Sequence, residues 1–589
     1  MMRRLTGSGI GGGIVIGHAY VLDSSVAVVP AAPVAIDNID AEIDRFEQAL
    51  TAASNDLQRT KTLSPAEDRP ELSAFLDAHI LMIKDPSLNR ATVDIIRNRR
   101  CKAEFALNEY RTQIIDVFEQ IEDPYLRTKQ EDVNQIIRQI LQHLRGNADH
   151  ALRSPSKELI EGQILVAHDL SPADILRFKN YQVGGFVTDL GSTVSHVAIL
   201  AHSLQIPAVV GLHGQISEIE NGVTVALDSG EGTVYVDPTE QMLDEIHARR
   251  REYERRQQEL ALLVHYRPTT VDGHNIDLQA NVELPSDVDQ AIDFGASGVG
   301  LYRTEYLFMN RNSMPDEEEQ FDAYSHVAST FDQVTIRTLD LGADKQVDGG
   351  REHGRVVTNP ALGIRAVRLC IQQPELFRPQ LLAIYRASAH GDVRCMIPML
   401  SSIEELKQVL SIINAVKLEL KSRGADFNPH MPIGAMIEVP AAAISADLFA
   451  QRLDFLSIGT NDLIQYTLAI DRVDDEVNYL YDPMNYSVLR LIKNTIEAGA
   501  RFETPVSMCG EMAGDTVYTR LLLGLGLDSF SINPSLLPEI KHLIRTSRMD
   551  QSIELASEIM AEPDSERRQD LLERLNSLDH ECNVLDATA

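Results

Sequence analysis

Residues 189–211 read DLGSTVSHVAILAHSLQIPAVVG. The apolar segment before them, residues 185–188, is typical of a short strand, and the segment after the polar loop is typical of a helix. We expect this helix to run from near Ser195 to about Leu204, which puts His196 in its first turn. Several residues of the loop are of types that cap helix starts: Asp189, Ser192, Thr193 and Ser195.

The placement of His196 suggests a chemical role. The first turn of a helix offers unpaired backbone N–H groups and the positive end of the helix dipole, which together favour a bound phosphoryl group. Imidazole is a nucleophile that is partly neutral near pH 7, so it can accept such a group and pass it on. On the local pattern alone, an ordinary helix-start histidine is the alternative.

The sequence of residues 189–211 resembles the phosphohistidine signature of the phosphoenolpyruvate-utilising enzymes. Three positions depart from that signature: Ser192 replaces a glycine, Val194 a threonine and His202 an arginine. The positions that match are Ser195, His196, Ala198, Ile199, Ala201, Ile206, Pro207, Ala208, Val209, Val210 and Gly211.

Composition limits the classes of function. A chain of 589 residues is long enough for three or four domains. The net charge of −33 argues against nucleic acid or an anionic membrane as a partner and suits a basic protein. We find neither a membrane-spanning apolar run nor the apolar core of a signal peptide, so we expect a cytoplasmic protein. Five scattered cysteines without a CxxC pair make disulfides or a zinc site improbable.

The first half of the chain has a strand pattern that is interrupted by helices. Residues 14–22 predict a first strand, and residues 36–144 repeat apolar positions at helical spacing, as in an antiparallel bundle. Strands and short helices alternate again from Gln163 to Val236, so we predict one α/β domain with the bundle inserted. Residues 240–264 predict a charged linker helix without an apolar face before Leu260.

From His274 onward, eight short apolar strands alternate with amphipathic helices, which predicts a (β/α)8 barrel followed by a helical tail from about Asp550. The predicted strands are residues 276–282, 298–302, 334–339, 394–399, 433–439, 455–459, 505–509 and 528–532.

In such a barrel the chemistry lies at the carboxyl ends of the strands. The residues found there in this sequence are four arginines, two carboxylates, an amide and a thiol: Arg303, Arg337, Arg365, Arg472, Glu438, Asp462, Asn461 and Cys509. Arginines at one rim suit a ligand with a carboxylate and a phosphate, such as phosphoenolpyruvate. Glu438 and Asp462 could hold a hard divalent ion such as Mg²⁺.

Six motifs of this second half together resemble the enzyme I family of the bacterial phosphotransferase system, the phosphoenolpyruvate–protein phosphotransferases. The motifs are GVGLYRTEYLFMNR, DLGADK, NPALGIRA, IEVPAA, SIGTNDLIQYTLAIDR and MCGEMAGD, and the similarity covers almost the whole chain. The resemblance implies that Glu438 and Asp462 bind Mg²⁺ and that Cys509 protonates the enolate carbon. It also implies which residues hold phosphoenolpyruvate: Arg303, Arg337, Arg365, Asn461 and Arg472.

The same resemblance implies a reaction and a domain plan. The phosphoryl group of phosphoenolpyruvate passes to His196 and then to a histidine of the phosphocarrier protein HPr, and the chain forms a homodimer through its barrels. The implied domains are a swivelling phosphohistidine domain (1–30 and 150–237), an inserted helical HPr-binding domain (31–149), a linker helix (238–268) and a phosphoenolpyruvate-binding barrel (269–589).

Two alternatives stay open at this point. The dikinase and synthase relatives that share the phosphohistidine and barrel modules need a nucleotide-binding domain, and this sequence offers no glycine-rich phosphate loop for one. A regulatory, nitrogen-type paralogue or a phosphoenolpyruvate-sensing phosphoprotein is kept open by the departures at Ser192, Val194 and His202.

Overall fold

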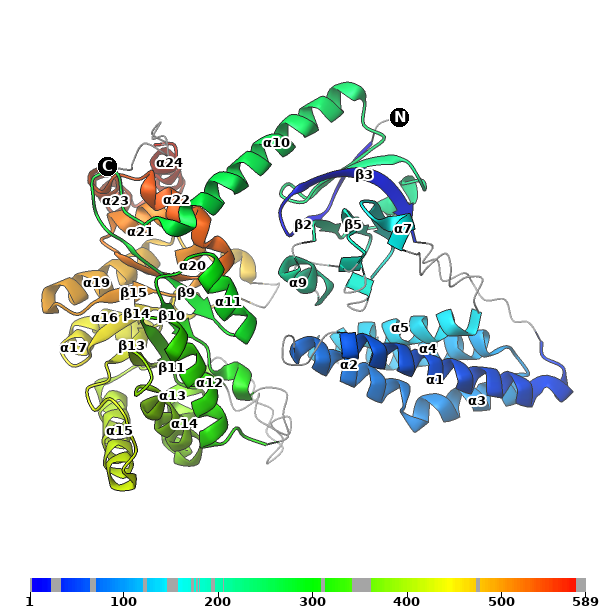
Figure 1. Ribbon diagram of the computed structural model, residues 1–589, viewed down its shortest axis with the longest axis horizontal. Helices are drawn as coiled ribbons and strands as arrows, with labels where there is room; N and C mark the ends of the chain where they lie inside the picture. Colours follow the sequence, from blue (N-terminus) through cyan, green and yellow to red (C-terminus); the bar gives the residue numbers. More distant parts are fainter. Residues whose placement is uncertain are drawn as a thin grey trace. The chain divides into compact units, whose positions relative to one another are not determined.

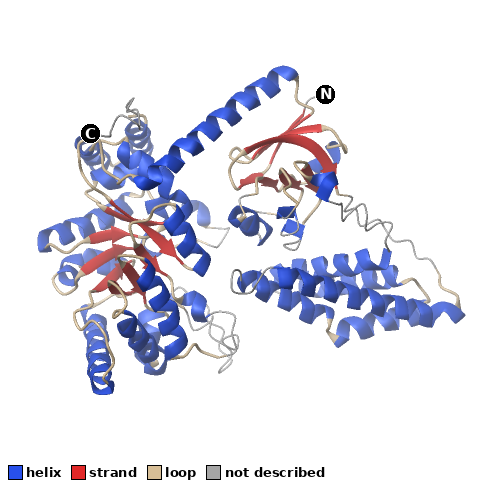
Figure 2. Cartoon of the chain, viewed as in Figure 1, coloured by secondary structure: helices blue, strands red, loops and turns tan. Residues whose placement is uncertain are grey.

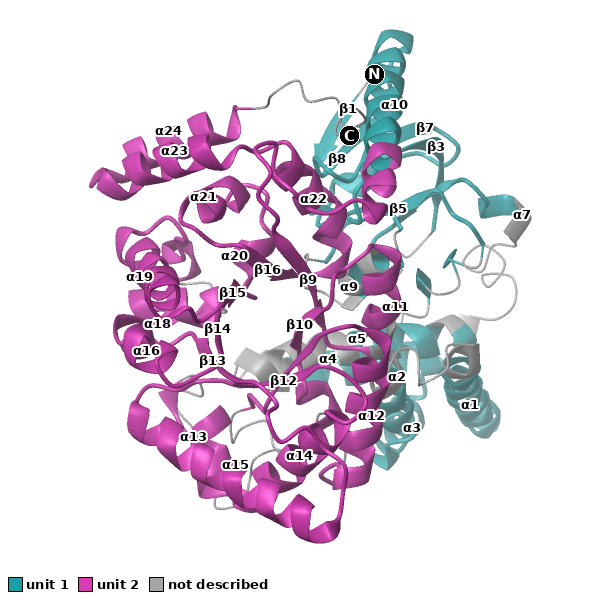
Figure 3. Ribbon diagram, turned by 60° about the vertical axis from the view of Figure 1, so that its left-hand side comes forward, with its two compact units in different colours: residues 1–257 teal, residues 258–589 magenta. Residues whose placement is uncertain are grey.

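The chain divides into two compact units, residues 1–257 and residues 258–589 (Figure 3). The computed structural model describes residues 3–22, 33–63, 70–119, 124–145, 157–170, 174–175, 178–179, 181–191, 196–204, 206–308, 313–341, 362–472 and 477–578.

The first unit contains an eight-stranded mixed sheet in the order β1-β8-β7-β3-β4-β5-β6-β2. Its strands are β1 (Arg3–Thr6), β2 (Ser8–Ile10), β3 (Ile14–Val21), β4 (Ile164–Ala167), β5 (Gly185–Thr188), β6 (Ala208–Val210), β7 (Thr224–Asp228) and β8 (Thr233–Val236). The central strands β3 to β6 run parallel to one another, whereas the remaining neighbours pair antiparallel. Parallel pairing brings the carboxyl ends of β4, β5 and β6 to one edge of the sheet.

The sequence did not predict β1 and β2. Their residues, RRLT and SGI, are too short and polar to show a strand period, and they pair only at the two ends of the sheet with β8 and β6. The short helices of this part are η1 (Ile36–Asn38), α7 (Lys157–Ile160), α9 (His196–Ser203) and η2 (Gln215–Glu218).

Among the described residues, five long antiparallel helices lie between β3 and β4, where the sequence predicts an inserted bundle (Figure 2). They are α1 (Ile39–Leu63), α2 (Pro70–Ile83), α3 (Pro86–Arg99), α4 (Ala103–Glu119) and α5 (Pro124–Arg145). Phe46, Ile96 and Ile140 are completely buried in the shared core. The guanidinium of Arg45 joins three of these helices, because it donates to Glu42 and Glu104 at 2.6 Å each and to the carbonyl of Leu144 at 2.7 Å.

The charged helix α10 (Glu240–Leu262) begins against the sheet of the first unit. Ile246 is buried with Ala226 and Tyr235, and Arg249 forms an ion pair of 3.0 Å with Asp228. The prediction that this helix has no apolar face before Leu260 is therefore wrong. Met242, Ile246 and the stem of Arg249 follow one another at helical spacing and seat the helix. So short an apolar stripe is easily missed among the charged residues that surround it.

The second unit is a closed barrel of eight parallel strands, in which each strand pairs with its successor and β16 closes on β9 (Figure 3). This confirms the predicted (β/α)8 barrel. The strands are β9 (Asp277–Val282), β10 (Val299–Tyr302), β11 (Val334–Arg337), β12 (Val393–Ile397), β13 (Ile433–Ile437), β14 (Phe455–Ile458), β15 (Val506–Met508) and β16 (Ser529–Ile532).

Helices surround the barrel strands (Figure 1). In chain order they are η3 (Leu263–His265), α11 (Pro285–Asp293), η4 (Glu305–Phe308), α12 (Glu317–Thr330), α13 (Ala366–Gln372), α14 (Pro374–Ala387), α15 (Ile403–Arg423), α16 (Pro440–Ile444), α17 (Ala446–Ala450), α18 (Thr460–Leu468), η7 (Asn478–Leu480), α19 (Tyr486–Phe502), α20 (Glu511–Gly514), α21 (Thr519–Gly524), η8 (Pro534–Leu536) and α22 (Leu537–Arg545). The predicted helical tail is α23 (Met549–Ala561) and α24 (Ser565–Asn576).

The barrel core is apolar, whereas polar residues follow the carboxyl ends of its strands. Ile336, Ile397 and Ile458 are buried in this core near the ends of their strands. Among the residues described, no helix has the length and apolar character needed to span a membrane.

Glu42 in the helical insertion gives a pH-dependent contribution to stability. Burial raises its pKa, but hydrogen bonds from Arg45 and from the Ala103 amide outweigh this and lower the pKa overall. A carboxyl group with a lowered pKa stabilises the fold above its unfolded pKa, and that stabilisation is lost as pH falls through the folded value.

We therefore expect Glu42→Gln to destabilise the helical insertion by about 1–2 kcal/mol at neutral pH and by much less in acid. Hydrogen exchange of the α1 and α4 amides at the two pH values, corrected for intrinsic rates, measures this. Glu47→Gln, at an exposed position of α1, is the control. Equal destabilisation at both pH values would contradict the assignment.

Candidate active site

The barrel brings every candidate residue of the second half to one rim. Arg303 follows β10, Arg337 ends β11, Glu438 follows β13 and Cys509 follows β15. The others also lie beyond strand ends: Arg365 directly before α13, Asn461 and Asp462 in the first turn of α18, and Arg472 after α18. Because all eight strands are parallel, positions more than 200 residues apart in the chain face one opening.

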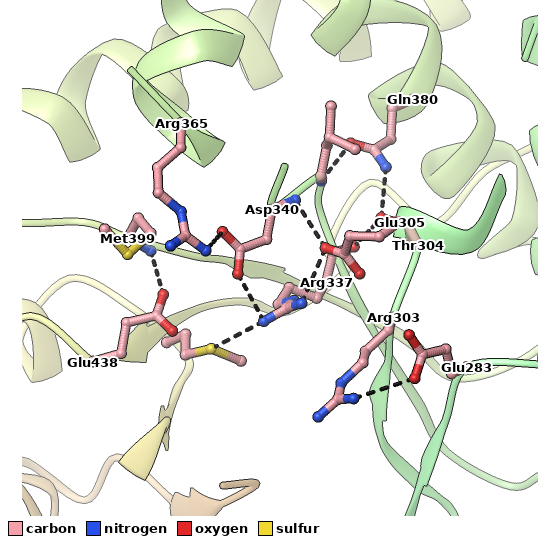
Figure 4. Close-up of polar contacts among 12 residues, drawn as sticks. Glu283, Arg303, Thr304, Glu305, Arg337, Asp340, Arg365, Gln380, Met399 and Glu438 are labelled. Carbon is pink, nitrogen blue, oxygen red and sulfur yellow. Dashed lines mark hydrogen bonds and ion pairs between the residues drawn. The ribbon is translucent and has the colours of Figure 1, made fainter. Parts of the chain in front are cut away.

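Two of the rim arginines share one carboxylate (Figure 4). Asp340 accepts from Arg337 at 3.0 Å with one oxygen and from Arg365 at 2.9 Å with the other. Arg337 is further paired with Glu305 at 3.0 Å. Burial by itself would lower the pKa of both arginines, but these carboxylates outweigh it, so the pKa of each is raised and both stay charged.

The other two rim arginines, Arg303 and Arg472, are more exposed, and their ion pairs are longer. Arg303 pairs with Glu283 at 3.2 Å, and Arg472 with Glu511 at 3.5 Å. Asn461 fixes Glu511 from a second side, since its amide donates to the Glu511 carboxylate at 2.8 Å and accepts from the Glu511 N–H at 2.9 Å. Each rim arginine thus has a carboxylate partner that an anionic ligand can replace or share.

The sequence did not predict these carboxylate partners. Glu305 and Asp340 belong to the same strand-end motifs as Arg303 and Arg337, so the strand-end rule applied to acidic residues would have found them. The same rule would have found Glu283, which directly follows β9, and Glu511, which lies two residues after Cys509. Only the pairing of each carboxylate with its arginine depends on closure of the barrel.

Three carboxylates form a cluster that could hold a metal ion. One oxygen from each of Asp340, Glu438 and Asp462 lies within 4.8 Å of the other two, and this is the only such group among the residues described. Burial, followed by the charges of Asp340 and Asp462, raises the pKa of Glu438 well above its ordinary value. Burial likewise raises the pKa of Asp462.

The donor set of this cluster fits a hard divalent cation, which prefers oxygen ligands. Both oxygens of Asp340 already accept from arginines. One oxygen of Glu438 accepts from the Met399 N–H at 2.6 Å, and its second oxygen is the one left for a cation. Glu438 and Asp462, the two residues that the sequence singled out, are therefore better placed as ligands than Asp340.

Cys509 is buried beneath the rim. Burial raises its thiol pKa, partly offset by a hydrogen bond from the Ser457 hydroxyl at 3.2 Å and by the charge of Arg337. The side chain is therefore a thiol at neutral pH and has a proton to give. A Cβ on the next residue, Gly510, would stand 1.9 Å from the Thr460 hydroxyl, so only glycine lets these loops approach.

The histidine region of the first unit is described in part. His196 is the first residue of α9, close to the predicted helix start. The side chains of His196 and His202, and residues 192–195, lie outside the described part of the chain. The role of His196 and the effect of the three departures therefore remain predictions.

Asp189, directly after β5, acts differently from the predicted helix cap. Its buried carboxylate accepts from the Gly214 N–H at 2.6 Å and lies 3.2 Å from Nδ1 of His168, which follows β4. It thus connects the ends of three parallel strands, because Gly214 lies in the loop after β6. These contacts fix the residues that follow β5 at the edge where the carboxyl ends of β4, β5 and β6 meet. The chain continues from this edge toward His196.

The hydrogen bond to Cys509 gives a test of the thiol environment. Removing the hydroxyl in Ser457→Ala should raise the thiol pKa further, because the thiolate loses its donor. The pH profile of Cys509 alkylation, followed on its own peptide by mass spectrometry, should then move to higher pH. Ser507→Ala, on the adjacent strand β15, is the control, because the Ser507 hydroxyl donates to the Leu456 carbonyl at 3.5 Å. An unchanged profile in Ser457→Ala would show that the hydroxyl does not tune the thiol.

Three family models match: the PEP-utilising enzyme N-terminal domain over residues 6–129, the mobile domain over 159–232 and the PEP-binding domain over 257–549. A solved structure titled as an NMR structure of enzyme I is 29% identical, with a TM-score of 0.35, over 42% of this chain and 99% of that one.

Curated relatives match almost from end to end. The phosphoenolpyruvate-protein phosphotransferase of Cupriavidus necator is 41% identical over 97% of this chain and 99% of its own length. That of Staphylococcus epidermidis is 38% identical over 98% of this chain and 100% of its own length. The chain therefore belongs to the family of phosphoenolpyruvate–protein phosphotransferases among the PEP-utilising enzymes.

Proposed function

We propose that this enzyme transfers the phosphoryl group of phosphoenolpyruvate to its own His196 and then to a histidine of the phosphocarrier protein HPr, as the first step of a sugar phosphotransferase system. Membership in the family makes the chain an enzyme that moves a phosphoryl group from phosphoenolpyruvate to protein. Beyond this activity, we propose that His196 is the residue that accepts the phosphoryl group and that HPr is the protein that receives it.

The observation that carries this proposal is the barrel rim. Four arginines, which lie at or after the ends of three of the barrel strands, meet there with a carboxylate cluster and a buried thiol. In the proposal Arg303, Arg337, Arg365 and Arg472 bind the phosphate and the carboxylate of phosphoenolpyruvate, and Asn461 contributes an amide. Guanidinium groups suit this ligand because they can bind such anions through two parallel hydrogen bonds.

Glu438 and Asp462 are the proposed ligands of Mg²⁺. When bound, this ion neutralises charge on the phosphate oxygens of the substrate as a Lewis acid. The raised pKa values of the two carboxyl groups support the assignment, since buried, mutually repelling carboxylates are stabilised as anions by a cation.

In the proposed transfer, the bond from phosphorus to the enol oxygen breaks as a bond from phosphorus to an imidazole nitrogen of His196 forms. The arginines stabilise the charge on the transferring group and on the departing enolate. Cys509 then gives its proton to the enolate carbon, which yields pyruvate. The resulting thiolate accepts the hydrogen bond from Ser457, which limits the cost of leaving this charge buried.

The domain plan is part of the proposal. We assign residues 1–30 and 150–237 to the swivelling histidine domain, 31–149 to HPr binding, 238–268 to the linker helix and 269–589 to the barrel. Exposed Leu81, 70% accessible, and exposed Asp77 lie on helix α2 and would suit a basic partner with an apolar contact.

A homodimer through the barrels and a cytoplasmic location complete the proposal. Apolar side chains exposed on the adjoining helices α16, α17 and α19, namely Ile444, Leu448 and Tyr486, offer a surface that a second copy could cover. The free cysteines of the described chain fit a reducing compartment.

The acceptor assignment is tested by His196→Ala. We expect this variant to gain no acid-labile, base-stable phosphate from phosphoenolpyruvate and Mg²⁺, yet to bind phosphoenolpyruvate like the wild type, because the arginines belong to the other unit. Labelled phosphate transfer and calorimetry measure the two properties. Phosphate gained by the variant would assign the acceptor to another residue.

The metal assignment is tested by Glu438→Gln and Asp462→Asn. Each should lower the Mg²⁺-dependent rate of phosphorylation at least about 100-fold, because the charge that neutralises the phosphate oxygens is lost. Glu404→Gln, at an exposed position of α15, should leave the rate unchanged. Full Mg²⁺-dependent activity in both site variants would place the ion elsewhere.

A further inference from the structure

A buried amide lies directly behind the rim. The side chain of Gln380, on α14, has no exposed surface. Its oxygen accepts from the Leu339 N–H at 2.9 Å, and its nitrogen donates to the hydroxyls of Thr304 at 3.1 Å and Tyr324 at 3.3 Å (Figure 4 shows Gln380 and Thr304). A helix of the outer ring is thus bonded to the ends of two barrel strands.

Each of the two groups that Gln380 bonds at these strand ends lies, in the sequence, between a proposed substrate-binding arginine and a carboxylate that pairs with Arg337. Thr304 stands between Arg303 and Glu305, and Leu339 lies between Arg337 and Asp340. Fixing these two positions therefore fixes the backbone from which two arginines and two carboxylates start.

Regular strand pairing does not reach these positions. The register between β10 and β11 ends at Tyr302 and Ile336. Beyond it, side chains join the two loops: the Thr304 hydroxyl donates to the Arg337 carbonyl at 3.0 Å, and the Asp340 N–H donates to Glu305 at 2.8 Å. Gln380 completes this bracing from outside, because it bonds one group in each loop.

We infer that Gln380 is a positioning residue of the proposed phosphoenolpyruvate site, which sets the spacing between Arg303 and Arg337 through Thr304 and Leu339. The inference rests on the proposed function of the rim. Two arginines from different strands must close on one small anion, and a displacement of about 1 Å can reduce a rate about 100-fold. Loss of a hydrogen bond that orients a ligand-binding residue commonly lowers affinity or activity about 10–100-fold.

The fold supplies a matched control in Gln320 on α12. This glutamine is also buried, at 1% exposed, and it contacts the other side of Tyr324. Its nitrogen donates to the Pro315 carbonyl at 3.1 Å, and its oxygen accepts from the Tyr324 hydroxyl at 3.1 Å. Replacing Gln320 also removes buried hydrogen bonds, so it should lower the stability of the fold about as much as replacing Gln380. Among the described residues, and unlike Gln380, its side chain makes no hydrogen bond to one that closely follows a barrel strand.

The test compares Gln380→Leu with Gln320→Leu in the full-length chain. Single-turnover phosphorylation by phosphoenolpyruvate and Mg²⁺, calorimetric binding of phosphoenolpyruvate and thermal unfolding are measured on both. We expect Gln380→Leu to slow phosphorylation about 10–100-fold, with a smaller loss of affinity. Gln320→Leu should stay within about threefold of the wild type at a similar loss of melting temperature.

Thr304 gives a second, independent pair of variants. Thr304→Val removes the hydroxyl with little change of shape and should reproduce the defect, whereas Thr304→Ser should restore most of the rate. In Gln380→Leu with Thr304→Val, the combined defect should be smaller than the product of the single defects, because both remove one network. If Gln380→Leu does not fold, the Thr304 pair decides the question.

Two results would overturn the inference: a wild-type rate in Gln380→Leu, or equal loss of rate in Gln320→Leu, which would tie the loss to stability alone. A wild-type chain that binds phosphoenolpyruvate but gains no phosphate contradicts the proposed function instead. Affinity then becomes the readout, and the inference still requires weaker binding in Gln380→Leu than in Gln320→Leu.

Discussion

The carboxylate of Asp340, held between the guanidinium groups of Arg337 and Arg365, is the interaction on which the rim depends. Both arginines are largely buried, and buried cations are stable only when paired. The pairing keeps them charged and oriented in the absence of ligand. It also brings a negative charge close to Glu438 and Asp462. Burial first, and this charge in addition, raise the pKa of each, and a cation bound at the cluster would stabilise their charged forms.

The rim is thus a set of charges that stabilise one another and that a substrate can rearrange. An incoming anion can take the place of a carboxylate on an arginine, and a cation can relieve the repulsion among the acids. The ion pairs hold the guanidinium groups charged at the rim before a ligand arrives. The buried thiol beneath it keeps its proton because burial removes the water that would solvate the thiolate.

The same geometric rule operates in both units. In the barrel and in the parallel part of the first sheet, polar residues collect where the carboxyl ends of parallel strands meet. Asp189 in the first sheet and Asp340 in the barrel both follow a strand and use a carboxylate to brace neighbouring loops. A buried acid in this position compensates for the hydrogen bonds that end with the strand ladder.

The sequence by itself determined the strand–helix alternation, the inserted bundle and the positions of the strand-end residues, because apolar periodicity and strand ends are local properties. Its motifs also singled out His196, Arg337 and Cys509 as candidate site residues, and the roles of these residues remain predictions. Only the tertiary structure decided which carboxylate pairs with which arginine, that β1 and β2 join the sheet, that Ile246 seats α10, and that Gln380 reaches the rim from α14. These depend on contacts between residues distant in the chain, which closure of the barrel and sheet creates and which leave no period in the sequence.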